Sequence, residues 1–163
     1  MTLKPLLLMD VDGVLNPFPD TPEGFEEHAF FFPEEDEPVR LLRAHGDWLV
    51  ELAEVYEIAW ATGWGDNANR FLAPHFGLPA YPVVVVPSVR FDPVEKVPAI
   101  DVFAGDRPAA WVDDIVTPEA RAWAATREAP TLLVEVDPAV GLVRAHVDEL
   151  LAWAAGVAAT SRG

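Results

Sequence analysis

Short apolar runs alternate along the chain with longer segments in which apolar and polar residues are mixed. The apolar runs cover residues 6–9, 57–61, 81–86, 109–112 and 131–136. Segments with helical periodicity cover residues 45–56, 66–76, 93–103, 117–128 and 147–159. Such alternation is typical of βα units, whose strands pair in parallel. The pattern therefore predicts an α/β protein with a five-stranded parallel sheet.

The valine run at 83–86 indicates how this sheet is covered. A strand that is β-branched throughout suits burial on both faces, because a strand wetted on one face alternates apolar and polar residues. We therefore expect helices on both faces, which is a three-layer, Rossmann-like fold.

Residues that favour helix ends stand at the borders of the helical segments. Asp66, Asp92 and Thr117 are expected to cap helix starts, and the last two precede a proline. Gly77 is expected to end the second helix, before Leu78 and Pro79.

One segment, residues 16–38, has neither period and contains five prolines. We expect it to form a small flap, or minimal cap, over the carboxyl ends of the strands. No cation lies between Lys4 and Arg40, and the flap carries Asp20, Glu23, Glu26, Glu27, Glu34, Glu35, Asp36 and Glu37. A solvated acidic surface is the favoured interpretation, and repulsion of anionic macromolecules is the alternative.

Composition limits the class of protein. The 163 residues include no cysteine and predict one domain, residues 1–163, that folds without disulfides. The net charge of −16 disfavours nucleic acid as a partner. No apolar stretch is long enough to span a membrane, and no secretory signal is evident. We therefore expect a soluble, cytoplasmic protein that acts on a small molecule; the sequence does not predict its oligomeric state.

Two acidic pairs close apolar runs. Asp10 and Asp12 follow the run at 6–9, and Asp113 and Asp114 follow the run at 109–112. Ligands of open parallel sheets bind at these carboxyl ends. Two carboxylates about 4 Å apart repel by ~4 kcal/mol at an effective dielectric constant of about 20, so the pairs favour a shared cation. Mg²⁺ is the expected ion because it prefers oxygen ligands and often bridges carboxylates to a phosphate.

Other residues suit phosphate binding. The Thr62 hydroxyl and the Gly63 amide, after the second run, can donate hydrogen bonds to phosphoryl oxygens. Lys96 lies in the helix that precedes the strand ending in Asp113 and Asp114. Taken singly these signals are weak, because a threonine at a strand end usually bonds its own backbone and a helical lysine is usually solvated.

The order of these motifs resembles that of the haloacid dehalogenase (HAD) superfamily. The resemblance rests on Asp10-Val11-Asp12-Gly13-Val14-Leu15-Asn16, then Thr62, then Lys96, then Asp113-Asp114, and covers the whole chain. The segment 60–64 is also similar to a small uncharacterised bacterial branch of that superfamily. About 50 residues separate Asp12 from Thr62 and 34 separate Thr62 from Lys96, which leaves no room for a large cap domain.

The resemblance implies a Mg²⁺-dependent phosphatase with an aspartyl-phosphate intermediate. Asp10 would be the nucleophile and Asp12 the general acid and base, while Thr62, Gly63 and Lys96 would hold the phosphoryl group. The metal would be held by the Asp10 carboxylate, the Asp12 backbone carbonyl and Asp114, with Asp113 behind them or bonded to Lys96; the division between Asp113 and Asp114 stays open. The dehalogenases that name the superfamily lack the second aspartate, so carbon–halogen cleavage is disfavoured.

Alternatives remain at this point. A noncatalytic HAD-like domain that binds Mg²⁺ or a phosphorylated partner would keep the same fold, and a phosphotransferase or phosphomutase would keep the same site. Trp64, beside Thr62, is expected to pack at the rim of the site, or alternatively to stack on a substrate ring.

Overall fold

The main sheet has four parallel strands in the order β4-β1-β5-β6 within the residues that the structure describes, which are 3–29, 36–87 and 92–161 of a computed structural model. The strands are β1 (Leu6–Met9), β4 (Glu57–Trp60), β5 (Ala109–Asp113) and β6 (Thr131–Glu135). The predicted α/β class with a parallel, Rossmann-like sheet is confirmed.

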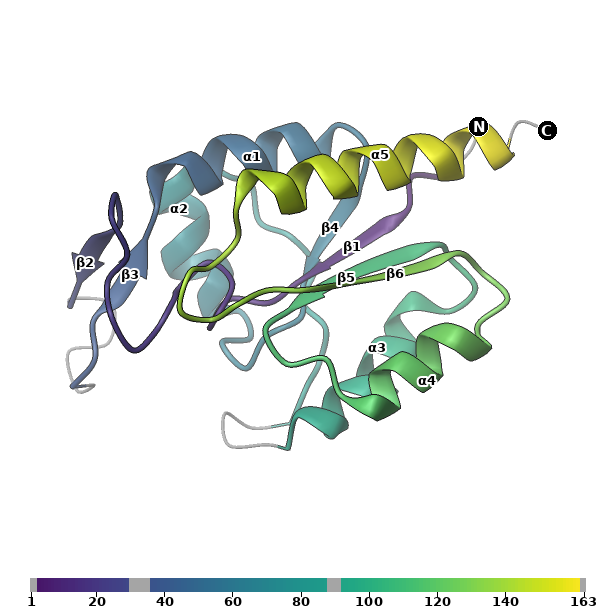
Figure 1. Cartoon of the computed structure of the whole chain (residues 1–163), viewed down its shortest axis with the longest axis horizontal. Coiled ribbons are helices and arrows are strands. Elements are labelled where there is room, and N and C mark those ends of the chain that lie inside the picture. Colours follow the sequence, from purple (N-terminus) through teal and green to yellow (C-terminus); the bar gives the residue numbers. More distant parts are fainter. Residues whose placement is uncertain (1–2, 30–35, 88–91, 162–163) are drawn as a thin grey trace.

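Helices cover both faces of this sheet (Figure 1). On one face lie α1 (Arg43–Ala53) and α5 (Arg144–Ser161), and on the other lie α3 (Lys96–Ala104) and α4 (Pro118–Thr126). The central strand β1 is buried on both sides, because Leu7 and Met9 join one apolar core and Leu6 and Leu8 join the other. A strand in this position reads as a continuous apolar run, which is why its sequence predicted it.

The predicted strand at 81–86 is reduced to one bridge beside β4. Trp60 donates its backbone N–H to the Pro82 oxygen at 2.9 Å and accepts from the Val84 N–H at 2.8 Å. Pro82 has no N–H to extend a ladder, and Val85 is 87% exposed. The expectations of a fifth strand and of a valine run covered on both faces are therefore wrong for this segment.

Helix ends follow the sequence signals at three of four positions. The Asp92 carboxylate accepts from the Val94 N–H at 3.1 Å, ahead of a 3-10 turn, η2 (Pro93–Glu95), that leads into α3. Thr117 caps α4 by accepting from the Ala120 N–H at 3.0 Å. Gly77 ends α2 (Ala73–Phe76) with φ of 70°.

At the fourth position, the Asp66 side chain does not cap a helix as expected. Its backbone oxygen accepts from the Asn69 and Arg70 amides, while its carboxylate accepts from the Asn69 side chain at 3.1 Å. The segment that follows is a π-helix, η1 (Ala68–Leu72), which continues into α2. The Asn69 side-chain oxygen accepts from Trp60 Nε1 and the Tyr81 backbone amide. Contacts with residues outside this turn therefore also stabilise its conformation.

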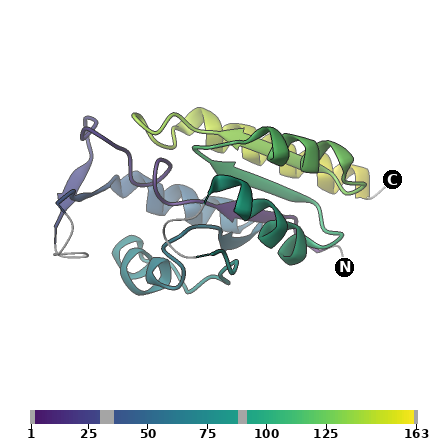
Figure 2. The same cartoon turned by 90° about the horizontal axis from the view of Figure 1, so that it is seen from below.

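The flap segment contains regular structure that its sequence did not predict. β2 (Glu26–His28) pairs antiparallel with β3 (Val39–Leu41), so the hairpin extends beyond residue 38. Figure 2 shows the hairpin at the end of the molecule opposite the two termini. The acidic residues Glu34 and Glu35 lie outside the described residues.

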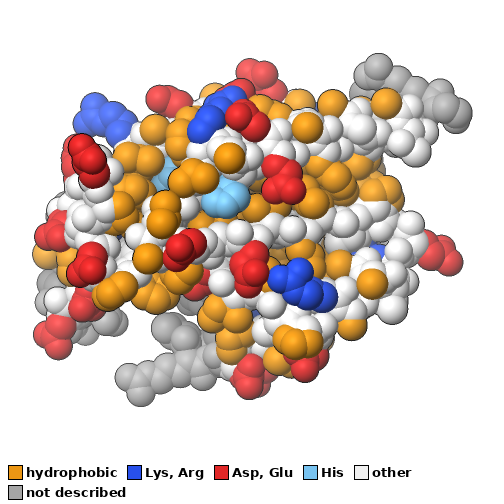
Figure 3. All heavy atoms as spheres, viewed as in Figure 1, with side chains coloured by type: hydrophobic (Ala, Val, Ile, Leu, Met, Phe, Trp, Pro, Cys, Tyr) orange, Lys and Arg blue, Asp and Glu red, His pale blue; other side chains and the backbone are white. Residues whose placement is uncertain are grey.

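The surface carries the acidic excess of the sequence. In Figure 3, acidic side chains are scattered over the visible face and basic ones are few. None of the helices in the described part of the chain has both the length and the apolar character needed to cross a membrane.

The single bridge at Val83 leads us to expect different rates of amide hydrogen exchange at neighbouring valines. The Val84 amide is expected to exchange more slowly than the Val85 amide, because the Val84 N–H is bonded to Trp60 and Val85 is largely exposed. The Leu8 amide in the central strand serves as the slow reference. Equal, strong protection of Val84 and Val85 by NMR-detected exchange would show that this segment is a full strand in solution.

Candidate active site

The register of the sheet positions the first residue of the site. Met9 at the end of β1 pairs with Trp60 on β4 and Val112 on β5. Asp10 follows Met9 and donates its backbone N–H to the Val112 oxygen at 3.1 Å. The carboxyl ends of parallel strands meet at one sheet edge, so Asp10 and Asp113 come together there.

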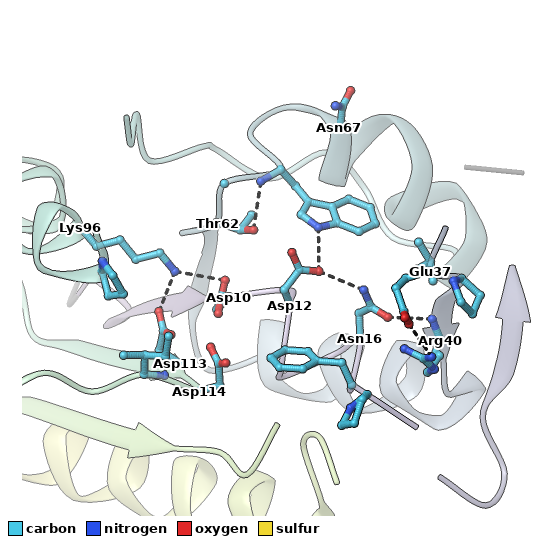
Figure 4. Close-up of a pocket in the computed structure, with 18 residues that line it drawn as sticks. Asp10, Asp12, Asn16, Glu37, Arg40, Thr62, Asn67, Lys96, Asp113 and Asp114 are labelled. Carbon is cyan, nitrogen blue, oxygen red and sulfur yellow. Dashed lines mark hydrogen bonds and ion pairs between the residues drawn. The ribbon is translucent and has the colours of Figure 1, made fainter. Parts of the chain in front are cut away.

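Lys96 reaches this edge from the start of α3. Its Nζ lies 3.1 Å from Asp10 Oδ1 and 2.7 Å from Asp113 Oδ2, and the residue is only 6% exposed (Figure 4). A buried ammonium between two buried carboxylates offsets part of their mutual repulsion. The fold thus brings Lys96 into contact with Asp10, which lies 86 positions before it in the chain, and with Asp113, which lies 17 positions after it.

Asp113 is held by protein donors on both oxygens. Besides Lys96, Trp111 Nε1 donates to Oδ2 at 3.2 Å, and the Ile115 N–H donates to Oδ1 at 3.0 Å. The expected contact between Asp113 and Lys96 is present. Which of Asp113 and Asp114 ligates a metal directly stays a prediction, although the donors on Asp113 favour Asp114 for that role.

Gly13 allows Asp114 to reach the site. Its φ is +82°, which L residues with a side chain rarely adopt, and a Cβ at this position would overlap the Asp114 carboxyl group. Two physical reasons therefore explain the glycine in the first motif: the positive φ of the backbone turn and the close approach of the second acidic pair.

The electrostatics of the cluster favour an added cation. Burial raises the pKa of Asp10 well above its usual value, and Asp113 and Asp114 add to this while Lys96 opposes it. Burial together with the neighbouring Asp113 raises the pKa of Asp114 to about 6. Burial alone would lower the pKa of Lys96, but Asp10 and Asp113 outweigh it, so the net pKa is raised and the lysine stays charged.

The donor set fits a hard divalent ion. One carboxylate oxygen from each of Asp10, Asp113 and Asp114 lies within 4.8 Å of the others, the one such group found among residues 3–29, 36–87 and 92–161. Three carboxylates against one ammonium leave two negative charges uncompensated when all are ionised. A site that offers only carboxylate oxygens suits Mg²⁺, Mn²⁺ or Ca²⁺ better than a soft metal.

Thr62 and Gly63 lie at the end of the neighbouring strand. Thr62 is buried, and its hydroxyl oxygen accepts from the Trp64 N–H at 3.2 Å. This is the local backbone contact that is common for such threonines, and it leaves the hydroxyl hydrogen to donate elsewhere. Both residues line the same cavity as Asp10 and Lys96.

Asp12 stands apart from the carboxylate cluster. Its side chain is exposed, and its Oδ1 accepts from Asn16 Nδ2 at 2.9 Å and from Trp64 Nε1 at 3.0 Å (Figure 4). The Asp12 carboxylate is not part of the three-residue metal group, so the only metal contact predicted for this residue is through its backbone carbonyl.

A cavity of about 750 Å³ joins these residues to the flap. Its lining includes Phe18, Glu37 and Arg40 from the flap hairpin and its approach, besides the motif residues. Arg40 is a site residue that sequence reasoning missed, and nothing in its local sequence marks it. Asn16 ends the first motif, but no role was expected for its side chain. Trp64 was noted, yet neither of its two expected roles included a hydrogen bond to Asp12.

Comparison with known proteins adds no family assignment. No protein-family model matches the chain, and no curated protein matches it.

Gly13→Ala is expected to abolish or strongly weaken divalent-cation binding, because the new Cβ displaces the Asp114 carboxyl group. Gly77→Ala is the matched control, since Gly77 also has positive φ, +70°, but its Cβ would meet no atom within 4 Å. Both variants should lose about 1 kcal/mol of stability from backbone strain. Titration with Mg²⁺ or Mn²⁺ by calorimetry separates them: equal cation affinity in both variants would contradict the role given to Gly13.

Stability without divalent cations should fall as the pH rises from about 4 to about 6. The pKa of Asp114 is raised in the folded protein to about 6 from an unfolded value near 4. Between these values the folded state binds more protons than the unfolded state, so raising the pH costs stability. Asp114→Asn should therefore melt higher than the wild type at pH 7.5 in EDTA, with the gap closing towards pH 4. Adding Mg²⁺ should reverse the order at pH 7.5; a gap that does not depend on pH would contradict the assignment.

Proposed function

We propose that this protein is a Mg²⁺-dependent phosphomonoester hydrolase of the HAD type that acts through an aspartyl-phosphate. The observation that carries the proposal is the setting of Asp10. It is a buried carboxylate at the carboxyl end of the central strand, 3.1 Å from the Lys96 ammonium, and it lines a cavity large enough for a small organic phosphate.

In the proposed reaction an Asp10 oxygen attacks the phosphorus in line with the leaving oxygen. Asp12 gives its proton to that oxygen as the ester bond breaks, and the alcohol leaves. A water molecule then attacks the phosphorus of the aspartyl-phosphate and passes a proton to Asp12. The bond between Asp10 and phosphorus breaks, inorganic phosphate leaves, and both aspartates return to their starting state.

The surrounding residues supply the electrostatics of this reaction. Lys96 and the donors on Thr62 and Gly63 would hold the phosphoryl oxygens on which negative charge gathers. Mg²⁺, when bound by Asp10, Asp114 and the Asp12 carbonyl, would supply further positive charge there. Burial and the neighbouring carboxylates raise the pKa values of Asp10 and Asp114, so a bound cation would help to keep Asp10 ionised as the nucleophile.

The substrate proposed is a small-molecule phosphoester. The acidic excess of the chain opposes a nucleic acid, and the cavity wall carries Glu37 at the flap side.

Asp10→Asn is expected to lower Mg²⁺-dependent hydrolysis of p-nitrophenyl phosphate by about a thousandfold or more, because an amide oxygen is a poor nucleophile. Asp47→Asn is the matched control: it makes the same change of charge at an exposed position of α1, away from the cavity, and should keep full activity. Turnover is measured with and without Mg²⁺.

The result separates the alternatives. Activity retained by Asp10→Asn would refute the nucleophile assignment. Absence of turnover in the wild type, together with no Mg²⁺-dependent binding of a phosphate-mimicking fluoride complex, would refute the phosphatase and favour a noncatalytic domain. Phosphoryl transfer to an added alcohol in preference to water would instead identify a phosphotransferase.

A further inference from the structure

One oxygen of Asp12 is held by two side chains from separate parts of the chain. Asn16 Nδ2, in the loop after β1, donates to Asp12 Oδ1 at 2.9 Å, and Trp64 Nε1, in the turn after β4, donates to the same oxygen at 3.0 Å. No other hydrogen bond to the Asp12 carboxylate is found among the described residues.

The direction of each hydrogen bond is fixed by chemistry. An indole N–H can only donate, so Oδ1 accepts from Trp64. The backbone N–H of Arg40 also can only donate, and it lies 2.7 Å from Asn16 Oδ1. The amide oxygen of Asn16 must therefore face Arg40, which turns its amide nitrogen towards Asp12. With two donors aimed at it, Oδ1 is an acceptor and has no room for a proton of its own.

We propose that Trp64 and Asn16 are positioning residues that hold Asp12 Oδ1 so that its other oxygen, Oδ2, carries the proton in catalysis. This inference rests on the proposed function. Trp64 and Asn16 touch neither the phosphorus nor the leaving oxygen in this scheme; they act only through Asp12.

Both proton transfers then use one atom. In the first step the proton on Oδ2 passes to the leaving oxygen as its bond to phosphorus breaks and the bond from Asp10 forms. In the second step the attacking water passes a proton back to Oδ2 as the bond between phosphorus and Asp10 breaks. Oδ1 accepts the same two hydrogen bonds throughout, so the carboxyl group does not need to rotate between the steps.

The flap takes part through Arg40. This residue is the middle of β3, and it is buried at 6% exposure. Its side chain donates to the Pro17 oxygen at 3.2 Å, Thr21 Oγ1 at 2.9 Å and Glu37 Oε2 at 2.9 Å. Together with the hydrogen bond from the Arg40 N–H to Asn16, these contacts tie the hairpin to the loop that carries Asn16, so the orientation of Asp12 depends on the hairpin being in place. Figure 4 shows Asn16 between Asp12 and Arg40.

The test compares two aryl phosphates that differ in leaving group. Phenyl phosphate releases a poor leaving group and needs the acid, whereas p-nitrophenyl phosphate releases a good one and needs it less. Trp64→Phe keeps an aromatic ring and removes the N–H. It should lower kcat about tenfold more on phenyl phosphate than on p-nitrophenyl phosphate, because one of the two hydrogen bonds that orient the acid is lost.

The ratio of the kcat values on the two aryl phosphates cancels effects of the substitution that are common to both substrates. Any lost packing or stacking of the indole acts on both aryl esters alike, and the affinity for Mg²⁺ should not change because the Asp10 and Asp114 side chains are untouched. Trp123→Phe is the matched control: Trp123 Nε1 donates to Asp101 Oδ1 at 2.9 Å outside the cavity, so its loss should leave the ratio unchanged. Asn16→Ala, which removes the other donor, should shift the ratio in the same direction as Trp64→Phe.

The outcomes for the inference and for the function are distinct. If Trp64→Phe and Asn16→Ala fold but slow both esters equally, or slow neither, the positioning role is overturned while the phosphatase stands on the Asp10→Asn result. If both variants also lose Mg²⁺ affinity, their role is structural and the inference is overturned. A wild type that hydrolyses neither ester and binds no phosphate mimic with Mg²⁺ overturns the proposed function and the inference together.

Discussion

Three carboxylates converge where β1 and β5 end, and the ammonium group of Lys96 forms ion pairs with two of them. Lys96 contacts Asp10 and Asp113 at 3.1 and 2.7 Å, and all three residues are buried. Leaving such carboxylates uncompensated would cost several kcal/mol. The ion pairs therefore couple the placement of α3 over the sheet edge to the register of β1 and β5.

The site divides into a part fixed by the sheet and a part fixed by loops. Asp10 and Asp113 sit at strand ends in a buried, four-stranded frame, and Gly13 lets Asp114 close against them. Asp12 instead is exposed and is oriented by Trp64 and Asn16. In the proposed reaction this separates a rigid centre for phosphoryl transfer from a proton donor whose position the flap controls.

Prediction from the sequence succeeded where burial is uniform. The runs that form β1 and β5 are buried at every residue, and their continuous apolar sequences predicted buried strands. It failed at 81–86, where β-branched composition suggested a covered strand but Pro82 and an edge position limited pairing to one bridge. It failed also at Asp66, where the Asn69 side chain bonds Asp66, the Trp60 indole and the backbone of Tyr81. At 81–86 a proline within the run limited the pairing, and at Asp66 contacts with Trp60 and Tyr81 outweighed the capping signal.

The sequence by itself determined the α/β class, the strand ends that carry the acidic pairs and the motif residues that line one cavity, because local periodicity and strand-end position are encoded in neighbouring residues. The resemblance offered Lys96 as a partner of Asp113, and the structure has that contact. Only the tertiary structure decided the other partners: Trp111 for Asp113, and Trp64 and Asn16 for Asp12. Hydrogen bonds are satisfied within about 3 Å, and which side chains come that close is set by strand register, helix placement and the flap hairpin.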